Sequence, residues 1–74
     1  MKATINSISV EHDYSGTKYP NIEKTLMNVG YYPNIGDTIV DNDENETTYK
    51  VIDKSIFIDE DGISLLYSIR EPNT

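Results

Sequence analysis

The chain has 74 residues, of which 36% are hydrophobic and 26% charged, and its 13 acidic and 6 basic residues give a net charge of −7. A chain of this size buries only about 60–65% of its unfolded surface, so we expect one domain with a thin core. The absence of cysteine excludes disulfides and thiolate zinc sites. The acidic balance disfavours direct binding to nucleic-acid phosphates.

The N-terminal segment, residues 2–13, predicts a first strand rich in β-branched residues. Ile8 and Val10 share one parity along this strand, whereas Ile5 has the other. This change of parity indicates a β-bulge between Ile5 and Ile8. Residues 14–21 are rich in turn-forming residues and predict a loop.

The next segment is ambiguous between helix and strand. Ile22 and Leu26 have helical spacing and Gly30 is placed to end a helix, which favours a helix over residues 21–29. Alternating apolar residues favour instead a strand over residues 24–32. We prefer the strand, because the apolar content is sparse for a well-buried helix.

Three further strands are predicted in the second half of the chain, over residues 37–40, 47–57 and 63–70. The first follows a turn at residues 33–36, where proline and asparagine suit the central positions of a turn and glycine permits a positive φ. A hairpin turn at residues 59–62 precedes the last strand, whose apolar residues alternate regularly.

The longest of these strands changes its core-facing parity. Tyr49 and Val51 share one parity, whereas Ile56 and Ile58 share the other, so the strand must bend or bulge near Asp53.

Five short strands joined by tight turns predict a mainly all-β fold, a five-stranded antiparallel meander that closes into a small barrel. The alternative is an α+β fold with a short helix at about residues 21–29. We expect a single domain over residues 1–74, with the barrel in residues 1–70 and a flexible tail in residues 71–74.

The turn and the strand after it also carry a family resemblance. The segment P-N-I-G-D-T-I, followed by Y-K-V-I-D, resembles the P-x-x-G-D-x-[IV]…Y-x-V arrangement of SH3-like small β-barrels. Such barrels recur in small phage and mobile-element proteins, and the resemblance covers about residues 24–69. It implies a barrel fold, but the chain lacks the basic or aromatic groove residues of nucleic-acid-binding barrels.

An acidic loop at residues 41–46 suggests a calcium site, because Asp41, Asp43 and Asn45 match the first three ligand positions of an EF-hand loop. That loop also requires glycine at its sixth position and glutamate at its twelfth, and the chain has Glu46 and Ile52 there. The match fails, and we expect neither a metal nor another cofactor.

The same loop is a predicted contact surface. In a meander, the loop at residues 41–46 shares one end of the sheet with the loop at 13–21, and the tip at 59–62 lies at the other end. Tyrosines beside carboxylates suit an arginine- or lysine-rich partner. The predicted partner-binding residues are Tyr14, Tyr19, Asp41, Asp43, Glu44 and Glu46, with Glu11 and Asp13 beside them.

The pattern predicts a binding protein and not an enzyme. His12, the single histidine, has no nucleophile beside it in sequence, and its parity favours a hydrogen-bonded residue at the edge of the core. We expect a protein–protein interaction module that binds a basic partner through its acidic, tyrosine-containing end or through an exposed strand edge, in its narrowest form a phage-type inhibitor of a host nucleic-acid-binding defence protein. One alternative is a structural, homo-oligomeric phage or mobile-element component whose edge strands pair between subunits. Another is a nucleic-acid-binding barrel, although the basic residues are dispersed.

The expected location is the cytoplasm, the host cytoplasm if the chain is phage-encoded. The N-terminus has no apolar segment typical of a signal peptide, and no run approaches the roughly 18 apolar residues of a membrane span.

Overall fold

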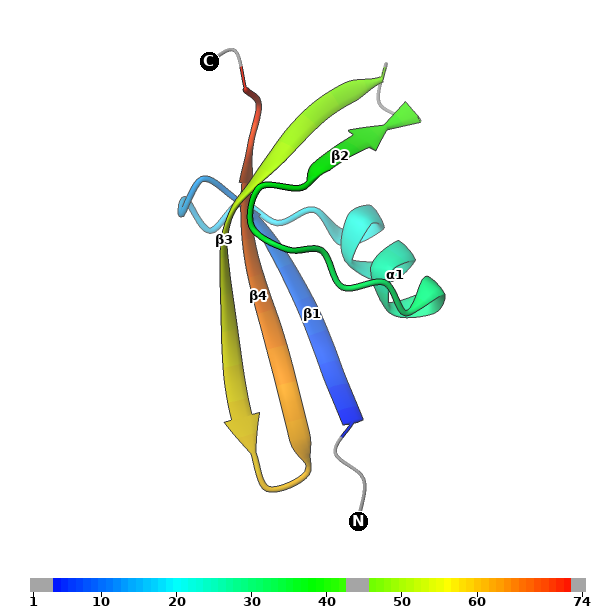
Figure 1. The fold of residues 1–74 in the computed structure, drawn as a ribbon, viewed down its shortest axis with the longest axis vertical. Helices are drawn as coiled ribbons and strands as arrows, with labels where there is room; N and C mark the ends of the chain where they lie inside the picture. The colour runs from blue at the N-terminus through cyan, green and yellow to red at the C-terminus, as the bar shows by residue number, and fades with distance from the viewer. Residues whose placement is uncertain (1–3, 43–45, 73–74) are drawn as a thin grey trace.

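A computed structural model describes residues 4–42 and 46–72 and confirms a mainly β fold with one short helix (Figure 1). No helix in these two ranges is long and apolar enough to cross a membrane. The elements, in chain order, are β1 (Thr4–His12), α1 (Pro20–Val29), β2 (Thr38–Asp41), β3 (Thr47–Asp59) and β4 (Gly62–Arg70).

The four strands form one sheet in the order β1-β4-β3-β2, curled into a half-barrel. Strands β2, β3 and β4 form the antiparallel meander, but β1 lies parallel to β4. The predicted five-stranded, fully antiparallel barrel is therefore corrected: the described residues contain four strands, and edge strands β1 and β2 are not paired with each other. A parallel pair needs a long connection, and the segment that contains α1, β2 and β3 supplies it.

The predicted strand over residues 24–32 is wrong, and the alternative helix is confirmed as α1. Pro20 occupies the first helical turn, where its missing N–H costs nothing. Gly30 ends the helix with φ 77°, and its N–H donates to the carbonyl of Leu26 at 2.8 Å. Two apolar residues, Ile22 and Leu26, are sufficient to pack the helix on the sheet, because the helix covers only part of one sheet face.

Both predicted parity changes are β-bulges. The register of β1 against β4 shifts between Ile5 and Ser7, and that of β3 against β4 shifts between Val51 and Asp53. As a consequence, Ile56 lies on the same sheet face as Val51, which faces α1.

The core lies between this face of the sheet and α1. Its buried apolar residues come from every element except β2, whose Ile39 packs at its margin. The buried set is Ile8, Val10, Ile22, Tyr49, Val51, Leu65, Tyr67 and Ile69.

The predicted turn before β2 is confirmed and attached to the core. Gly36 has φ 97°, and the N–H of Asp37 donates to the carbonyl of Asn34 at 3.0 Å. Pro33 is buried, and its carbonyl accepts a 2.8 Å hydrogen bond from the hydroxyl of Tyr67. This bond ties the segment between α1 and β2 to the middle of the sheet.

Candidate functional site

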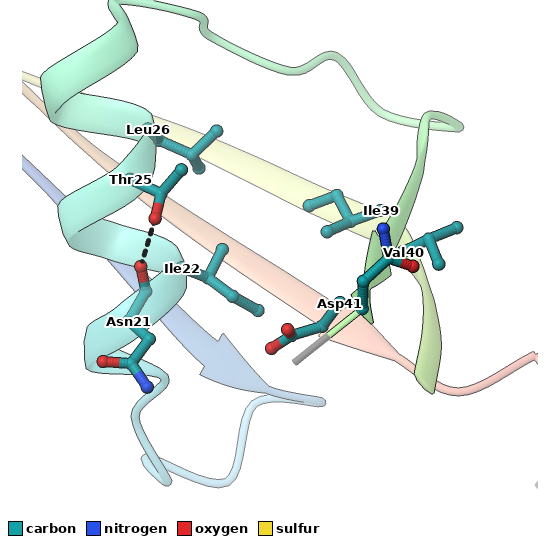
Figure 2. Close-up of a pocket in the computed structure, with 8 residues that line it drawn as sticks. Asn21, Ile22, Thr25, Leu26, Ile39, Val40 and Asp41 are labelled. Carbon is teal, nitrogen blue, oxygen red and sulfur yellow. Dashed lines mark hydrogen bonds between the residues drawn. The ribbon is translucent and has the colours of Figure 1, made fainter. Parts of the chain in front are cut away.

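An open groove of about 380 Å³ lies between α1 and β2 (Figure 2). Its apolar floor is formed by Ile22 and Leu26 of the helix and by Ile39 of the strand. The remaining lining residues are Asn21, Thr25, Val40, Asp41 and Asn42.

Local sequence explains the shape of the groove. Ile22 and Leu26 are four residues apart and therefore share one face of α1. Strand β2 pairs with only the first part of β3. Its residue Ile39 lies opposite the helix, and the space between them is open. Ile22 is buried while Leu26 and Ile39 are half-buried, which leaves apolar surface accessible from the open side.

The described part of the groove rim is polar and includes the carboxylate of Asp41. Asp41, the last residue of β2, extends its carboxylate toward the helix side of the groove in Figure 2. The hydroxyl of Thr25 donates to the carbonyl of Asn21 at 2.8 Å, which fixes the side chain of Thr25 on the opposite rim. None of the described lining residues is basic.

Of the two predicted interface tyrosines, Tyr19 lies on this helix-bearing side of the sheet. Its ring packs on Tyr49 with centroids 5.2 Å apart, and its hydroxyl lies 2.8 Å from Nδ1 of His12. Burial raises the pKa of the Tyr19 phenol above its usual value. Tyr19 is therefore half-buried and packs against the core. His12 is half-buried and hydrogen-bonded at the edge of the core, as its parity predicts.

Tyr14 lies on the opposite face of the sheet. Its hydroxyl donates to Asp53 at 3.2 Å, and Asp53 pairs with Ser68, which alternates with the core-facing residues of β4. Partial desolvation and the bond to Asp53 raise the pKa of Tyr14. On the same face, Asp13 forms a 2.9 Å ion pair with Arg70.

The predicted acidic surface is therefore divided. Asp41 and Tyr19 lie on the helix-bearing side, whereas Asp13 and Tyr14 lie on the other. Glu11 is also on the second side and accepts a 3.2 Å hydrogen bond from Ser68.

The acidic loop itself is described only in part. Asp43, Glu44 and Asn45 lie outside the described residues. Glu46 is exposed, with φ 55°, directly before β3. Of the predicted acidic residues that the structure describes, Asp41 is the one that lines the groove.

A second surface is the exposed apolar end of β3; the sequence predicted an exposed strand edge but did not locate it in these residues. Ile56, Phe57 and Ile58 are 55%, 52% and 82% exposed. The available signal was the unbroken run of three apolar residues, because a half-buried strand hides only alternate side chains. At least one residue of such a run must face away from the core.

In the two described ranges, no three histidine or acidic side chains are grouped closely enough to hold a metal ion. Comparison of the chain with protein-family models, with curated proteins and with solved structures found no match.

Proposed function

We propose that this chain is a non-enzymatic protein–protein interaction module that binds a short basic and apolar segment of a partner in the groove between α1 and β2. The observation that carries the proposal is the open apolar floor of Ile22, Leu26 and Ile39 beside the carboxylate of Asp41. An apolar floor beside a charged group binds by burying a side chain and orients it by charge.

The chemistry of the groove defines the partner. A volume of about 380 Å³ accommodates one or two aliphatic side chains, and the open side admits the main chain that carries them. Asp41 favours a lysine or arginine next to those side chains. The net charge of −7 steers a basic partner toward the chain and repels an acidic one.

Selection from a displayed random-peptide library tests this proposal and requires no candidate partner. We expect enriched peptides to carry an aliphatic residue beside lysine or arginine. Their binding is expected to shift the backbone amide resonances of Ile22, Leu26 and Ile39. Enriched peptides without basic residues, or resonance shifts confined to other parts of the sheet, would contradict the proposal.

Matched variants distinguish binding in the groove from non-specific binding. Leu26→Ala removes part of the floor and is expected to weaken peptide binding about tenfold. Val29→Ala truncates an exposed residue of the same helix that does not line the groove, so it is expected to leave binding unchanged. Asp41→Asn is expected to weaken binding and to reduce its salt dependence, while Asp59→Asn, at the far end of β3, serves as its control. Equal effects of the two alanine changes would refute the role of the groove.

A structural, oligomeric function is the second candidate, and the exposed end of β3 favours it.

A further inference from the structure

The second half of β3 forms a free edge of the sheet. Strand β2 pairs with β3 only up to Lys50, and the turn before β2 extends this cover to Val51. Beyond the bulge, residues 53–59 pair continuously with β4, and no strand in the described part of the chain pairs with their outer side. In Figure 1 this edge borders the lower half of the sheet.

The outer edge of β1 is different, because the chain covers it. The N–H of Val10 donates to the Glu23 carboxylate at 2.8 Å, and its carbonyl accepts from the N–H of Tyr19 at 3.0 Å. The lower part of β1 contains its bulge, which twists an edge away from pairing. The other edge strand, β2, has only four residues, Thr38–Asp41, so within the described residues the second half of β3 is the longer regular edge that combines an unpaired side with a run of exposed apolar side chains.

The backbone of this edge is oriented to accept another strand. Asp59 and Gly62 pair across the two-residue turn at 60–61, which directs the backbone N–H and C=O of Asp59 toward β4 and those of Lys54, five residues earlier, away from it; the N–H of Lys54 donates to the side chain of Asp53 at 2.8 Å. Since backbone groups alternate in direction along an antiparallel strand, the N–H and C=O groups of Ile56 and Ile58 also point outward. These N–H and C=O groups can form backbone hydrogen bonds with an added strand.

The side chains along the edge are self-complementary about Phe57. A two-fold axis through Phe57, normal to the sheet, would pair β3 antiparallel with β3 of a second copy. The resulting cross-strand pairs are Ile56 with Ile58, Ser55 with Asp59, and Lys54 with Glu60.

This register satisfies both the charges and the backbone. Lys54 meets Glu60, the residue directly after β3, at each end of an apolar centre. Ile56 and Ile58, whose backbone groups point outward, become the hydrogen-bonded pair. Moving the axis by one residue, to Ile56, would instead oppose Asp53 to Asp59, which is unfavourable.

We propose that this edge binds a second copy of the same chain, so that two half-barrel sheets join into one continuous sheet through antiparallel β3 strands centred on Phe57. The contact is isologous and closes after two copies, because it uses the same edge of each. It does not depend on the groove function proposed above.

Cysteine scanning tests the contact and its register, because the natural chain contains no cysteine. With Phe57→Cys, the two thiols face each other across a non-hydrogen-bonded pair about 4.5 Å apart between Cα atoms, and mild oxidation is expected to give a covalent dimer. With Ser55→Cys, each new cysteine lies opposite Asp59 of the other copy. The Cα atoms of the two cysteines are then four residues apart along the strands, about 13 Å, so no crosslink is expected. Crosslinking of Ser55→Cys in preference to Phe57→Cys would overturn the register.

Charge reversal tests the contact without new covalent chemistry. Sedimentation equilibrium of the unaltered chain is expected to show a monomer–dimer equilibrium. Lys54→Glu or Glu60→Lys is expected to raise its Kd at least about tenfold, because each change opposes like charges at both ends of the contact. The double reversal is expected to restore dimerisation, while Lys24→Glu on the exposed side of α1 has no effect.

Two outcomes would overturn the proposal. One is a chain that stays monomeric at millimolar concentration. The other is a dimer whose Kd responds to neither single reversal.

Discussion

The hydroxyl of Tyr67 is predicted to be a principal polar support of the fold. Tyr67 is 1% exposed, and its hydroxyl donates at 2.8 Å to the carbonyl of Pro33, which is itself buried. Tyr67→Phe removes the donor and leaves that carbonyl unsatisfied in the core. The expected loss in free energy of unfolding is about 1–2 kcal/mol at neutral pH, since a buried acceptor without a partner costs roughly this much.

The same residue predicts a distinct response to alkali. Burial, with a further contribution from the charge of Asp37, raises the pKa of Tyr67 to about 12. Because folding favours the protonated phenol, its contribution is fully present below pH 10 and is lost as pH rises through about 12. Each pH unit in that window removes on the order of 1 kcal/mol, so the loss across the window is on the order of 2 kcal/mol. Tyr67→Phe has no proton to lose there and escapes this loss.

Urea unfolding followed by circular dichroism, at several pH values between 7 and 11.5, measures both effects. The natural chain is expected to be more stable than Tyr67→Phe at pH 7, and this difference should shrink or reverse above pH 10. Tyr14→Phe is the matched control, because the Tyr14 side chain is largely exposed and its change should have a much smaller effect at pH 7. Equal losses for the two variants at pH 7, or a difference that stays constant up to pH 11.5, would refute the reasoning.

Two further predictions concern backbone and surface. Gly62→Ala is expected to destabilise the fold by at least about 3 kcal/mol, since the φ of Gly62 is 147° and an added Cβ would overlap the backbone carbonyl of Thr4. Gly16→Ala is the control: Gly16 has φ 85° but open space around it, so this change should cost about 1 kcal/mol. Equal urea midpoints for the two variants would contradict the prediction. Arg70→Ala breaks the ion pair with Asp13, whose side chains are 47% and 41% exposed, so the loss should stay below about 1 kcal/mol and vanish in high salt. A larger, salt-independent loss would show that Arg70 has a packing role.

Strand positions could be predicted because hydrophobic alternation is a local property. Ile8 and Val10 mark the core face of β1, and the parity change after Val51 correctly located the bulge in β3. The helix was ranked below the strand because its sequence signals are local, whereas the contacts that stabilise it are not. Ile22 and Leu26 are too few to indicate a buried helix, yet they pack on a sheet face assembled from distant strands.

The described residues of the two predicted loops lie at one end of the sheet but not on one face. Tyr14 follows Asp13, and both residues have left-handed backbone conformations, with φ 64° and 43°. This turn puts Tyr14 against Asp53, while the chain then returns to place Tyr19 against Tyr49. Such a crossing of the sheet edge depends on tertiary contacts, and neither turn composition nor strand parity encodes it.

The two proposed surfaces lie on opposite sides of the β3 bulge, which makes them separable. The groove adjoins the first residues of β3, whereas Phe57 is ten residues further along the strand, about 33 Å at the usual rise, in a molecule 42 Å long. A dimer through Phe57 would therefore leave both grooves open at its outer ends. Such a dimer binds a partner carrying two basic segments more tightly than a monomer does, because the second contact becomes intramolecular. Breaking the dimer with Lys54→Glu should abolish that gain while leaving the affinity for a single peptide unchanged. A parallel loss of single-peptide affinity would show instead that the two surfaces are coupled through the fold.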